Sequence, residues 1–453
     1  MELSKQNVLV VGSGKSGIAA MQLLKKAGAN CVLFDGNTEL DVEEIKGRLE
    51  DAKDAPVFLG TLPKEVDDAL TLIVLSPGVP TDLPMVEAYR QREIPIWGEI
   101  ELAFAFERGD VLAITGTNGK TTTTALLGEI MKAYYENVFV VGNIGIPYTQ
   151  MVTQTSENSV TVAEISSFQL ETVHDFRPVV SAILNITPDH LNRHHTMENY
   201  ALAKENITCN QSKEQYCVLN YEDDFLRAFG ENCKAQVIYF SSLRELADGY
   251  FCKDEEIYRA VSGKPERLMN IHDMKLLGRH NWENVMAAIA MADAYGVPMD
   301  VIIKTVCAFK AVEHRIEFVA TVGGVDYYND SKGTNPDAAI KGIEAMVKPT
   351  YLIGGGYDKQ STYDEWIESF DGKVKKLVLL GQTREKIADC AKAHGFTDYL
   401  FVESLQEAVD YCAGAAKAGE AVLLSPACAS WGMFPNYEVR GQMFKEMVFA
   451  LQK

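Results

Sequence analysis

The segment T-G-T-N-G-K-T-T at 115–122 has the residue types of a phosphate-binding loop. It follows the apolar run 111–115 and precedes a predicted helix that begins near Lys120. In such a loop, backbone amides and a lysine bind phosphate oxygens, and a threonine hydroxyl can bind Mg²⁺. The spacing is shorter than in the common G-x-x-x-x-G-K-[ST] pattern, because position 114 is Ile. A simple helix cap would leave the lysine and the glycines unexplained. The predicted ATP-binding residues here are Gly116, Thr117, Asn118, Gly119, Lys120, Thr121 and Thr122.

A second glycine-rich turn, G-S-G-K-S-G at 12–17, follows the predicted strand 7–12. Asp35 ends the next predicted strand, and Ser76-Pro77-Gly78 ends a later one. Taken alone, this pattern fits a dinucleotide site in which the acid binds a ribose hydroxyl, as in NAD-dependent oxidoreductases. A tight strand–helix turn without a ligand is the alternative. The pattern favours a phosphate-binding site over a turn without a ligand. It supports NAD as the ligand of that site much less strongly.

Three polar residues of the middle region have an ordinary structural explanation beside a functional one. Glu164 ends a predicted strand and is either a Mg²⁺ ligand or an acid at a helix N-terminus. His190, in I-T-P-D-H, is either a metal ligand or a loop histidine. Lys204 lies within a helical pattern, where a solvated lysine is expected. Residue type alone favours the ordinary explanation for His190 and Lys204.

Three polar loops follow predicted strands in the last third of the chain. They are N-D-S-K-G-T-N-P-D-A (329–338), I-G-G-G-Y-D-K (353–359) and L-L-S-P-A-C-A-S-W (423–431). Helix capping explains Asn335 and Pro336 but leaves Asp330 and Lys332 without a role. Because the carboxyl ends of parallel strands share one edge of a sheet, these loops predict a binding site there.

The elements that must position these residues alternate between short apolar runs and helical patterns. This alternation predicts α/β structure with largely parallel sheets. The pattern restarts twice, which predicts three domains at 1–99, 100–311 and 312–453. Within the second of these, residues 242–275 are predicted to be irregular. The predicted strands are 7–12, 30–35, 71–76, 94–98, 111–116, 138–143, 160–166, 179–186, 216–220, 325–330, 350–356, 376–381, 399–402 and 421–426; the predicted helices include 18–27, 85–91 and two that begin near Lys120 and Asn281.

Composition limits the classes of partner. The 453 residues carry a formal charge of −20, which argues against nucleic-acid binding but leaves phosphorylated small molecules possible. No apolar run is long enough to span a membrane, and the N-terminal sequence has no signal-peptide pattern. The nine cysteines form no C-x-x-C pair, as expected for a reduced, cytoplasmic protein.

Taken together, these motifs resemble those of the Mur ligase family over essentially the whole chain. The most specific matches are T-G-T-N-G-K-T, N-D-S-K-G-T-N-P-D-A and the C-terminal L-L-S-P-A-C-A-S-W-G-M-F-P-N-Y-E-V-R-G. The resemblance implies a Rossmann-like UDP-binding domain, a central P-loop ATPase domain and a C-terminal Rossmann-like domain that closes on ATP. It also implies an ATP-dependent ligase, acting as a monomer with small-molecule substrates. Such a ligase adds D-glutamate to UDP-N-acetylmuramoyl-L-alanine through an acyl phosphate, with two Mg²⁺ ions, in peptidoglycan precursor synthesis.

The resemblance also implies a role for each motif residue. Lys120, His190, Lys204, Arg315 and Lys332 would be catalytic, and Thr121, Glu164, His190 and a carbamylated Lys204 would hold the metal ions. Further ATP ligands would be Asn281, Asn284, His314, Arg315 and Asp330. The UDP-substrate would contact Ser13, Gly14, Lys15, Ser16, Asp35, Gly36, Asn37, Ser76, Pro77, Gly78, Asn143, Ser166 and Gln169. D-glutamate would contact Lys332, Thr334, Lys359, Ser430 and Tyr437. Asn37 and Tyr437 depart from the residues usual in the family, Arg and Phe.

Three alternatives remain at this point. Another amide ligase of the same superfamily, such as folylpolyglutamate synthase, shares the phosphate loop and would use a folate acceptor. An NAD-dependent oxidoreductase would use only the first glycine motif. A non-catalytic nucleotide-binding module would leave Lys120, Glu164, His190 and Lys204 without a common purpose.

Overall fold

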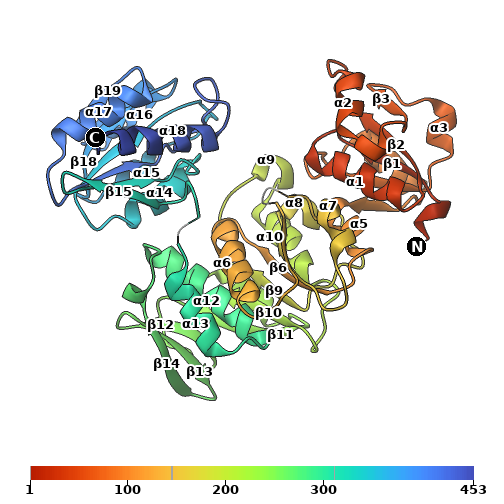
Figure 1. Cartoon of the computed structure of the whole chain (residues 1–453), viewed down its shortest axis with the longest axis horizontal. Coiled ribbons are helices and arrows are strands. Elements are labelled where there is room, and N and C mark those ends of the chain that lie inside the picture. The colour runs from red at the N-terminus through yellow and green to blue at the C-terminus, as the bar shows by residue number, and fades with distance from the viewer. Residues whose placement is uncertain (1, 144–145, 311, 453) are drawn as a thin grey trace. The chain divides into compact units, whose positions relative to one another are not determined.

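The computed structural model describes residues 2–143, 146–310 and 312–452. Three β-sheets follow one another along the chain, each with helices packed against it (Figure 1). Within the described residues, none of the helices combines the length and the apolar character that a membrane span requires. The chain divides into two compact units, Met1–Ile271 with Glu283–Cys307 and His272–Trp282 with Ala308–Lys453.

The N-terminal sheet, red in Figure 1, has five parallel strands in the order β3-β2-β1-β4-β5. The strand order reverses between β1 and β4, so their carboxyl ends flank the crevice where α/β sheets bind ligands. The turn at 12–17 and the loop at 76–78 lie at those two ends. The elements are β1 (Asn7–Val11), α1 (Lys15–Lys26), β2 (Asn30–Asp35), α2 (Val42–Arg48), β3 (Val57–Leu59), α3 (Lys64–Asp68), β4 (Leu72–Leu75), α4 (Pro84–Gln91), β5 (Ile96–Gly98) and α5 (Glu99–Phe104).

The middle sheet has nine strands in the order β14-β13-β12-β11-β10-β9-β6-β8-β7. Strands from β7 to β12 are parallel, and β6, which leads into the phosphate loop, lies between β8 and β9. Helix α6 packs on β7 and β8. The elements are β6 (Asp110–Thr115), α6 (Lys120–Lys132), β7 (Val138–Gly142), α7 (Tyr148–Met151), β8 (Val160–Glu164), α8 (Ser167–Leu170), β9 (Val180–Ile183), α9 (Leu191–His194), α10 (Met197–Glu205), β10 (Tyr216–Asn220), α11 (Asp224–Gly230), β11 (Gln236–Ser241), β12 (Gly249–Lys253), β13 (Glu256–Val261), β14 (Lys264–Asn270), α12 (Arg279–Ala294) and α13 (Met299–Ala308).

The prediction that residues 242–275 are irregular is wrong. This segment forms β12, β13 and β14, which extend the parallel sheet with antiparallel pairs. The turn between β12 and β13 uses Asp254 and Glu255, both at positive φ (49° and 63°). Hairpin turns of this kind usually contain glycine or asparagine, so no turn could be recognised there from the residue types.

The C-terminal sheet, blue in Figure 1, has the order β15-β16-β20-β17-β18-β19. Only β15 and β16 pair antiparallel. Strands β16, β20 and β17 are adjacent and parallel, so the three polar loops at 329–338, 423–431 and 353–359 share one sheet edge, as predicted. The elements are β15 (Glu317–Val322), β16 (Val325–Asn329), α14 (Pro336–Glu344), β17 (Thr350–Gly354), α15 (Asp364–Glu368), β18 (Val374–Leu379), α16 (Arg384–Ala393), β19 (Tyr399–Phe401), α17 (Leu405–Ala415), β20 (Ala421–Leu424) and α18 (Tyr437–Ala450).

Each predicted strand corresponds to a strand of one of these sheets, and the predicted helices correspond to α1, α4, α6 and α12. Strands β3, β11 and β15, together with β12, β13 and β14, were not predicted. The domain boundaries at 99/100 and 311/312 stay a prediction, and residue 311 lies outside the described residues.

Candidate active site

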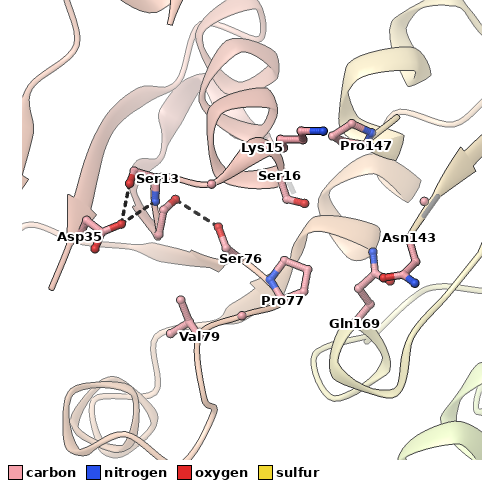
Figure 2. Close-up of a pocket in the computed structure, with 14 residues that line it drawn as sticks. Ser13, Lys15, Ser16, Asp35, Ser76, Pro77, Val79, Asn143, Pro147 and Gln169 are labelled. Carbon is pink, nitrogen blue, oxygen red and sulfur yellow. Dashed lines mark hydrogen bonds between the residues drawn. The ribbon is translucent and has the colours of Figure 1, made fainter. Parts of the chain in front are cut away.

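A cavity of about 490 Å³ lies at the carboxyl ends of β1 and β4 (Figure 2). Asn143 and Gln169, which come from the middle region, line it together with the N-terminal loops. Of the predicted UDP-substrate residues, Gly36, Asn37 and Ser166 are not among those that line it, and the amide of Asn37 donates to Asp35 at 3.0 Å instead. The predicted residues that line the cavity are Ser13, Gly14, Lys15, Ser16, Asp35, Ser76, Pro77, Gly78, Asn143 and Gln169.

The carboxylate of Asp35 holds the first glycine turn in place. The backbone N–H and the hydroxyl of Ser13 donate to Asp35 Oδ2 at 2.8 and 2.6 Å. Burial acts to raise the pKa of Asp35, but these hydrogen bonds and the one from Asn37 outweigh it, so the pKa is lowered. Asp35 is therefore an ionised group that positions the loop at the cavity.

Glycine is required where helix α1 meets this turn. A Cβ atom on Gly17 would lie 1.8 Å from the carbonyl oxygen of Gly12. Gly12 itself has φ of 99°, and its carbonyl accepts a hydrogen bond from Ser76 Oγ at 3.1 Å. The close approach brings the N-terminus of α1, and its unpaired amides, to the cavity.

The loop 116–119 joins β6 to α6, and Asn185 fixes its shape. The amide of Asn118 donates to Asn185 Oδ1 at 2.8 Å, and Asn185 Nδ2 donates to the carbonyl of Asn118 at 3.1 Å. The amide of Thr117 donates to the Asn185 carbonyl at 2.9 Å. Gly119, with φ of 86°, is the N-cap residue directly before α6. Asn185 was not predicted; its only sequence signal is a polar residue just after the apolar strand β9.

Two lysines converge on this loop. Lys120 Nζ donates to the carbonyls of Gly116 and Thr117 at 2.8 and 2.9 Å. Lys204 Nζ donates to the same Gly116 carbonyl at 2.8 Å, and its side chain is only 1% exposed. The expectation of a solvated lysine, drawn from residue type, is therefore wrong. Helix α10 turns Lys204 inward, against the ring of Tyr200.

The surroundings of Lys204 favour its neutral form. Burial, together with the charge of Lys120, holds the pKa of Lys204 well below its usual range, and Asp189 opposes this only in part. Tyr200, on the same helix, lies with its hydroxyl 3.1 Å from Thr117 Oγ1. Helix α10 thus directs a buried amine, with a lowered pKa, to the phosphate loop.

Glu164 is buried at the end of β8, with 2% of its surface exposed. Its Oε1 accepts from Asn143 Nδ2 at 2.8 Å, whereas its Oε2 has no hydrogen-bond partner among the described residues. The following helix, α8, is capped by Ser166 and Gln169, so Glu164 is not needed as its N-terminal acid. A buried carboxylate oxygen without a partner suits a hard cation such as Mg²⁺. Thr121 is buried in the first turn of α6.

His190 lies in the loop before α9, with φ of 53°. Its Nε2 is 3.5 Å from Asp189 Oδ2, and its ring contacts Phe168 edge-on. The charge of Asp189, in the same loop, acts to raise the pKa of Lys204, against burial and Lys120.

Arg193, which was not predicted, connects helix α9 to the N-terminal loop 77–79. Its guanidinium donates to the carbonyls of Pro77 and Val79 at 3.2 and 3.0 Å. It also donates to Glu171 at 2.6 and 3.1 Å and lies over the ring of Phe168. This arginine therefore fixes the 77–79 side of the first cavity.

Helix α12 carries the two predicted asparagines. The amide oxygen of Asn284 lies against Gly119, because a Cβ on that glycine would approach it to 2.1 Å. Asn284 is thus brought to the phosphate loop. Asn281 Nδ2 donates to the Leu277 carbonyl at 2.7 Å, within the other compact unit.

Asp330 and its neighbours lie in the C-terminal domain. Asp330 accepts from Ser425 Oγ at 2.7 Å and from the amide of Ile316 at 3.3 Å. Burial raises its pKa to about 7, against the effects of Ser425 and Arg315.

Arg315 Nε is buried without a hydrogen-bond partner among the described residues, and His314 Nδ1 lies 2.9 Å from Asn329 Nδ2. A buried guanidinium N–H without a partner suits an anionic ligand.

Arg440, which was also not predicted, ties two of the C-terminal loops together. Its guanidinium donates to Ser331 Oγ and to the Ser331 carbonyl at 2.9 and 2.7 Å, and to the Cys428 carbonyl at 3.3 Å. Ser331 Oγ donates in turn to the carbonyl of Tyr437 at the start of α18. One buried arginine therefore fixes the relative positions of the loops with Lys332, Thr334 and Ser430.

We expect Arg440→Ala to lower the melting temperature by about 5–10 °C, because three buried acceptors lose their donor. Arg384→Ala is the matched control, since that guanidinium pairs with the exposed Glu403 and should shift the melting temperature by less than about 2 °C. Calorimetry measures both. Equal shifts for the two variants would contradict the role of Arg440.

Two lysines flank the same edge of the C-terminal sheet. Lys332 Nζ lies 5.7 Å from the ring centre of Tyr437, and Lys359 Nζ lies 5.4 Å from that of Trp431. The loops are joined by the bond from the Tyr357 amide to the Ala429 carbonyl at 2.9 Å. The predicted residues Lys332, Thr334, Lys359, Ser430 and Tyr437 thus lie on connected loops of one domain.

Comparisons with known proteins agree with this architecture. Family models match at residues 6–98 (Mur ligase MurD-like, N-terminal domain), 114–292 (Mur ligase middle domain) and 314–428 (Mur ligase, glutamate ligase domain). The chain is 58% identical to the UDP-N-acetylmuramoylalanine–D-glutamate ligase of Lachnospira eligens, covering 99% of both chains. It is also 58% identical to the ligase of the same name from Lachnoclostridium phytofermentans, covering 100% of both.

Solved structures share the fold. The UDP-N-acetylmuramate-alanine ligase MurC of Thermotoga maritima aligns with a TM-score of 0.62 at 20% identity, covering 98% of this chain and 99% of that one. MurF of Acinetobacter baumannii aligns with a TM-score of 0.61 at 17% identity, covering 97% and 93%. With three matching domains and close relatives along its whole length, the chain belongs to the Mur ligase family.

Proposed function

We propose that the chain is an ATP-dependent ligase that joins D-glutamate to UDP-N-acetylmuramoyl-L-alanine in peptidoglycan precursor synthesis. The observation that carries this proposal is the 58% identity, over 99% of both chains, to a ligase whose name states both substrates. The proposal is further supported by three candidate binding regions, namely the phosphate loop, the N-terminal cavity and the connected C-terminal loops.

The reaction proceeds through an acyl phosphate. The terminal carboxylate of the UDP-substrate attacks the γ-phosphorus of ATP, and ADP leaves. The amine of D-glutamate then attacks the acyl carbon and loses a proton, and inorganic phosphate leaves. Since two anions must approach each other in the first step, positive charge is needed at the transferred phosphoryl group. Lys120, on the loop, and Arg315, with its buried Nε, supply it.

When bound, Mg²⁺ would supply further positive charge at the transferred phosphoryl group. Thr121 and Glu164 would hold one ion, and the unpartnered Oε2 of Glu164 supports this assignment. His190 and a carbamylated Lys204 would hold a second. Carbamylation joins CO₂ to a neutral amine and releases one proton, and the lowered pKa of Lys204 favours that form of the amine. The product is an anionic oxygen ligand of the kind that Mg²⁺ prefers.

The remaining residues bind and orient the three substrates. The amides and hydroxyls of the first cavity bind the UDP diphosphate, with Asn143, Ser166 and Gln169 along the muramoyl-peptide, and Asp35, Gly36 and Asn37 near the nucleoside. Lys332 and Lys359 pair with the two carboxylates of D-glutamate, helped by hydroxyls of Thr334 and Ser430. Asn281, Asn284, His314 and Asp330 complete the ATP site.

The working form is a cytoplasmic monomer whose partners are its small-molecule substrates, without nucleic acid or membrane. The charge of −20 supports the exclusion of nucleic acid.

We predict that phosphate release from ATP requires D-glutamate, UDP-N-acetylmuramoyl-L-alanine and Mg²⁺ together, because no subset completes the two steps. A coupled phosphate assay with each component omitted in turn measures this. L-glutamate, D-alanine and L-lysine in place of D-glutamate, and a folate in place of the UDP-substrate, serve as controls. Equal turnover with any of these would refute the assigned substrates.

A further inference from the structure

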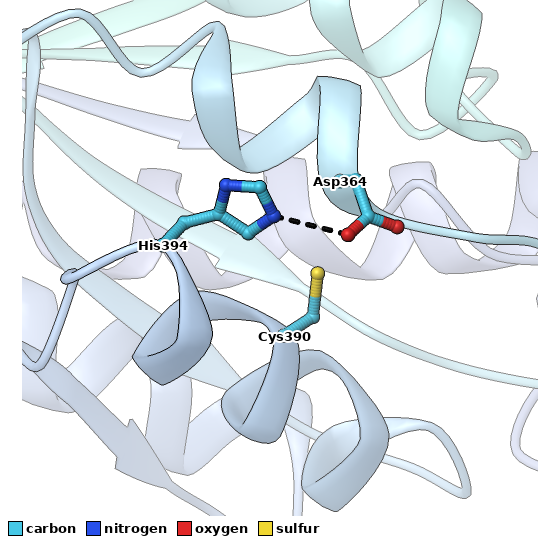
Figure 3. Close-up of side chains that lie close together, drawn as sticks. All are labelled: Asp364, Cys390 and His394. Atoms are coloured by element: carbon cyan, nitrogen blue, oxygen red, sulfur yellow. Dashed lines mark hydrogen bonds and ion pairs between the residues drawn. The ribbon is translucent and has the colours of Figure 1, made fainter.

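Four polar side chains of the C-terminal domain lie together away from the loops described above. Asp364 and Glu368 lie four residues apart on α15, and Cys390 and His394 lie four residues apart on α16 and at its end. Residues four apart share one face of a helix, so each helix presents a pair of ligand types to the other. Figure 3 shows Asp364, Cys390 and His394 directed toward one another.

The ligand atoms of Asp364, Cys390 and His394 all lie within 4.8 Å of one another. In a tetrahedral zinc site, ligand atoms are about 3.3–3.8 Å apart. His394 Nε2 is 3.0 Å from Asp364 Oδ1, so this pair needs to open slightly while the thiol moves inward. These side chains are partly exposed, which leaves them free to change rotamer.

The second nitrogen of His394 provides an independent observation. Its Nδ1 lies 3.5 Å from Glu368 Oε1, whereas its Nε2 pairs with Asp364. Histidines that bind zinc commonly donate their other N–H to a carboxylate, which fixes the tautomer and the ring orientation. Glu368 is placed to accept that bond and to leave Nε2 as the metal ligand.

We propose that Asp364, Cys390 and His394 form a zinc site, with Glu368 orienting the histidine. A thiolate, an imidazole and a carboxylate are a ligand set that favours Zn²⁺ over Mg²⁺, which takes oxygen ligands. Binding displaces the thiol proton, and the two anionic ligands then balance the charge of the ion. The ion joins α15 to α16 and leaves a fourth position for water.

One other group of potential ligands occurs among the described residues, namely Glu313, His314 and Glu317. There, Lys445 Nζ already lies 2.6 and 2.8 Å from the two glutamates. The ammonium group of Lys445 already pairs with these two carboxylates, so we propose no metal ion there.

Cobalt titration of the full-length, chelator-treated protein, with Mg²⁺ in excess, tests the zinc site. We expect one equivalent of Co²⁺ to give a thiolate-to-cobalt charge-transfer band that Zn²⁺ abolishes. Cobalt at the proposed Mg²⁺ positions gives no such band, because no thiol is assigned there. The result is thus independent of the proposed ligase activity. Absence of the band in the unmodified protein would overturn the proposal.

Variants assign the band to these residues. Cys390→Ser should remove it, and His394→Gln should weaken Zn²⁺ binding at least about 100-fold. Glu368→Gln should keep the band and weaken binding about 10-fold. Cys209→Ser, at an exposed cysteine of the middle domain, is the matched control and should change nothing. Melting temperatures without metal report whether each variant folds. A band that persists in Cys390→Ser shows that another cysteine binds the ion and refutes the site.

Discussion

Lys120→Ala should reduce ATP turnover by at least about 10³-fold while leaving the affinity for the UDP-substrate within about twofold. The Lys120 ammonium lies over the phosphate loop, where it bonds to the carbonyls of Gly116 and Thr117. We expect the same group to bind phosphate oxygens of ATP, as the lysine of a phosphate-binding loop does. The residues that line the N-terminal cavity do not include this loop, so the two binding energies should be nearly additive.

Two measurements separate the effects of Lys120→Ala. Phosphate release reports ATP turnover, and calorimetry with the UDP-substrate alone reports the first cavity. Lys15→Ala is the reciprocal control, since Lys15 lines that cavity and lies outside the phosphate loop. It should weaken UDP-substrate binding and leave ATP affinity nearly unchanged. Loss of UDP-substrate binding in Lys120→Ala would show that the two sites are not independent.

The parallel sheets were predictable because their strands are short, apolar runs that end at glycine or polar loops. Parallel strands are buried on both faces, so they lack the alternation of a half-exposed sheet and stand out from helices. The position of a loop at a strand end then follows from topology. For this reason the loops at 12–17, 115–122 and 329–338 could be placed at sheet edges from sequence alone.

The strands that were missed are exposed on one side or bounded by unusual turns. Strand β14 is K-P-E-R-L-M-N, mostly polar and exposed, with a proline near its start. Its partner β13 begins after the Asp254-Glu255 turn, which lacks glycine. Such strands are held by pairing with their neighbours rather than by their own pattern, and pairing is not visible in the sequence.

Within the site, sequence reasoning found residues at motif positions and missed those that hold the motifs together. Asn185, Arg193 and Arg440 each bond to loops more than 60 residues away or on another element. Their roles depend on tertiary contacts that no local spacing encodes. For the first glycine motif, the local pattern predicts a binding site but not its ligand. The pattern alone fits a dinucleotide as well as a UDP-sugar.

Lys204→Ala should be nearly inactive, with turnover reduced by at least about 10³-fold. Composition and helical pattern predicted a solvated lysine, but the amine is buried beside Lys120 and its pKa is held well below the usual range. A buried, neutral amine is the form that reacts with CO₂. A carbamate there would supply two oxygens that share one negative charge beside the phosphate loop, which an alanine cannot replace. Lys213→Ala, at an exposed lysine of the same domain, is the matched control and should keep normal turnover.

Chemical rescue and a charge-conserving variant distinguish a carbamate from a simple cation. Short carboxylic acids such as acetate should restore part of the rate of Lys204→Ala, because they fill the vacant ligand position with the same type of oxygen. Lys204→Arg should stay inactive, since a guanidinium remains charged and does not form a carbamate under these conditions. With ¹³C-labelled bicarbonate, the unmodified protein should show a carbamate carbon resonance that both variants lack. Near-normal turnover of Lys204→Arg would mean that the residue acts as a cation near the phosphates and not as a metal ligand.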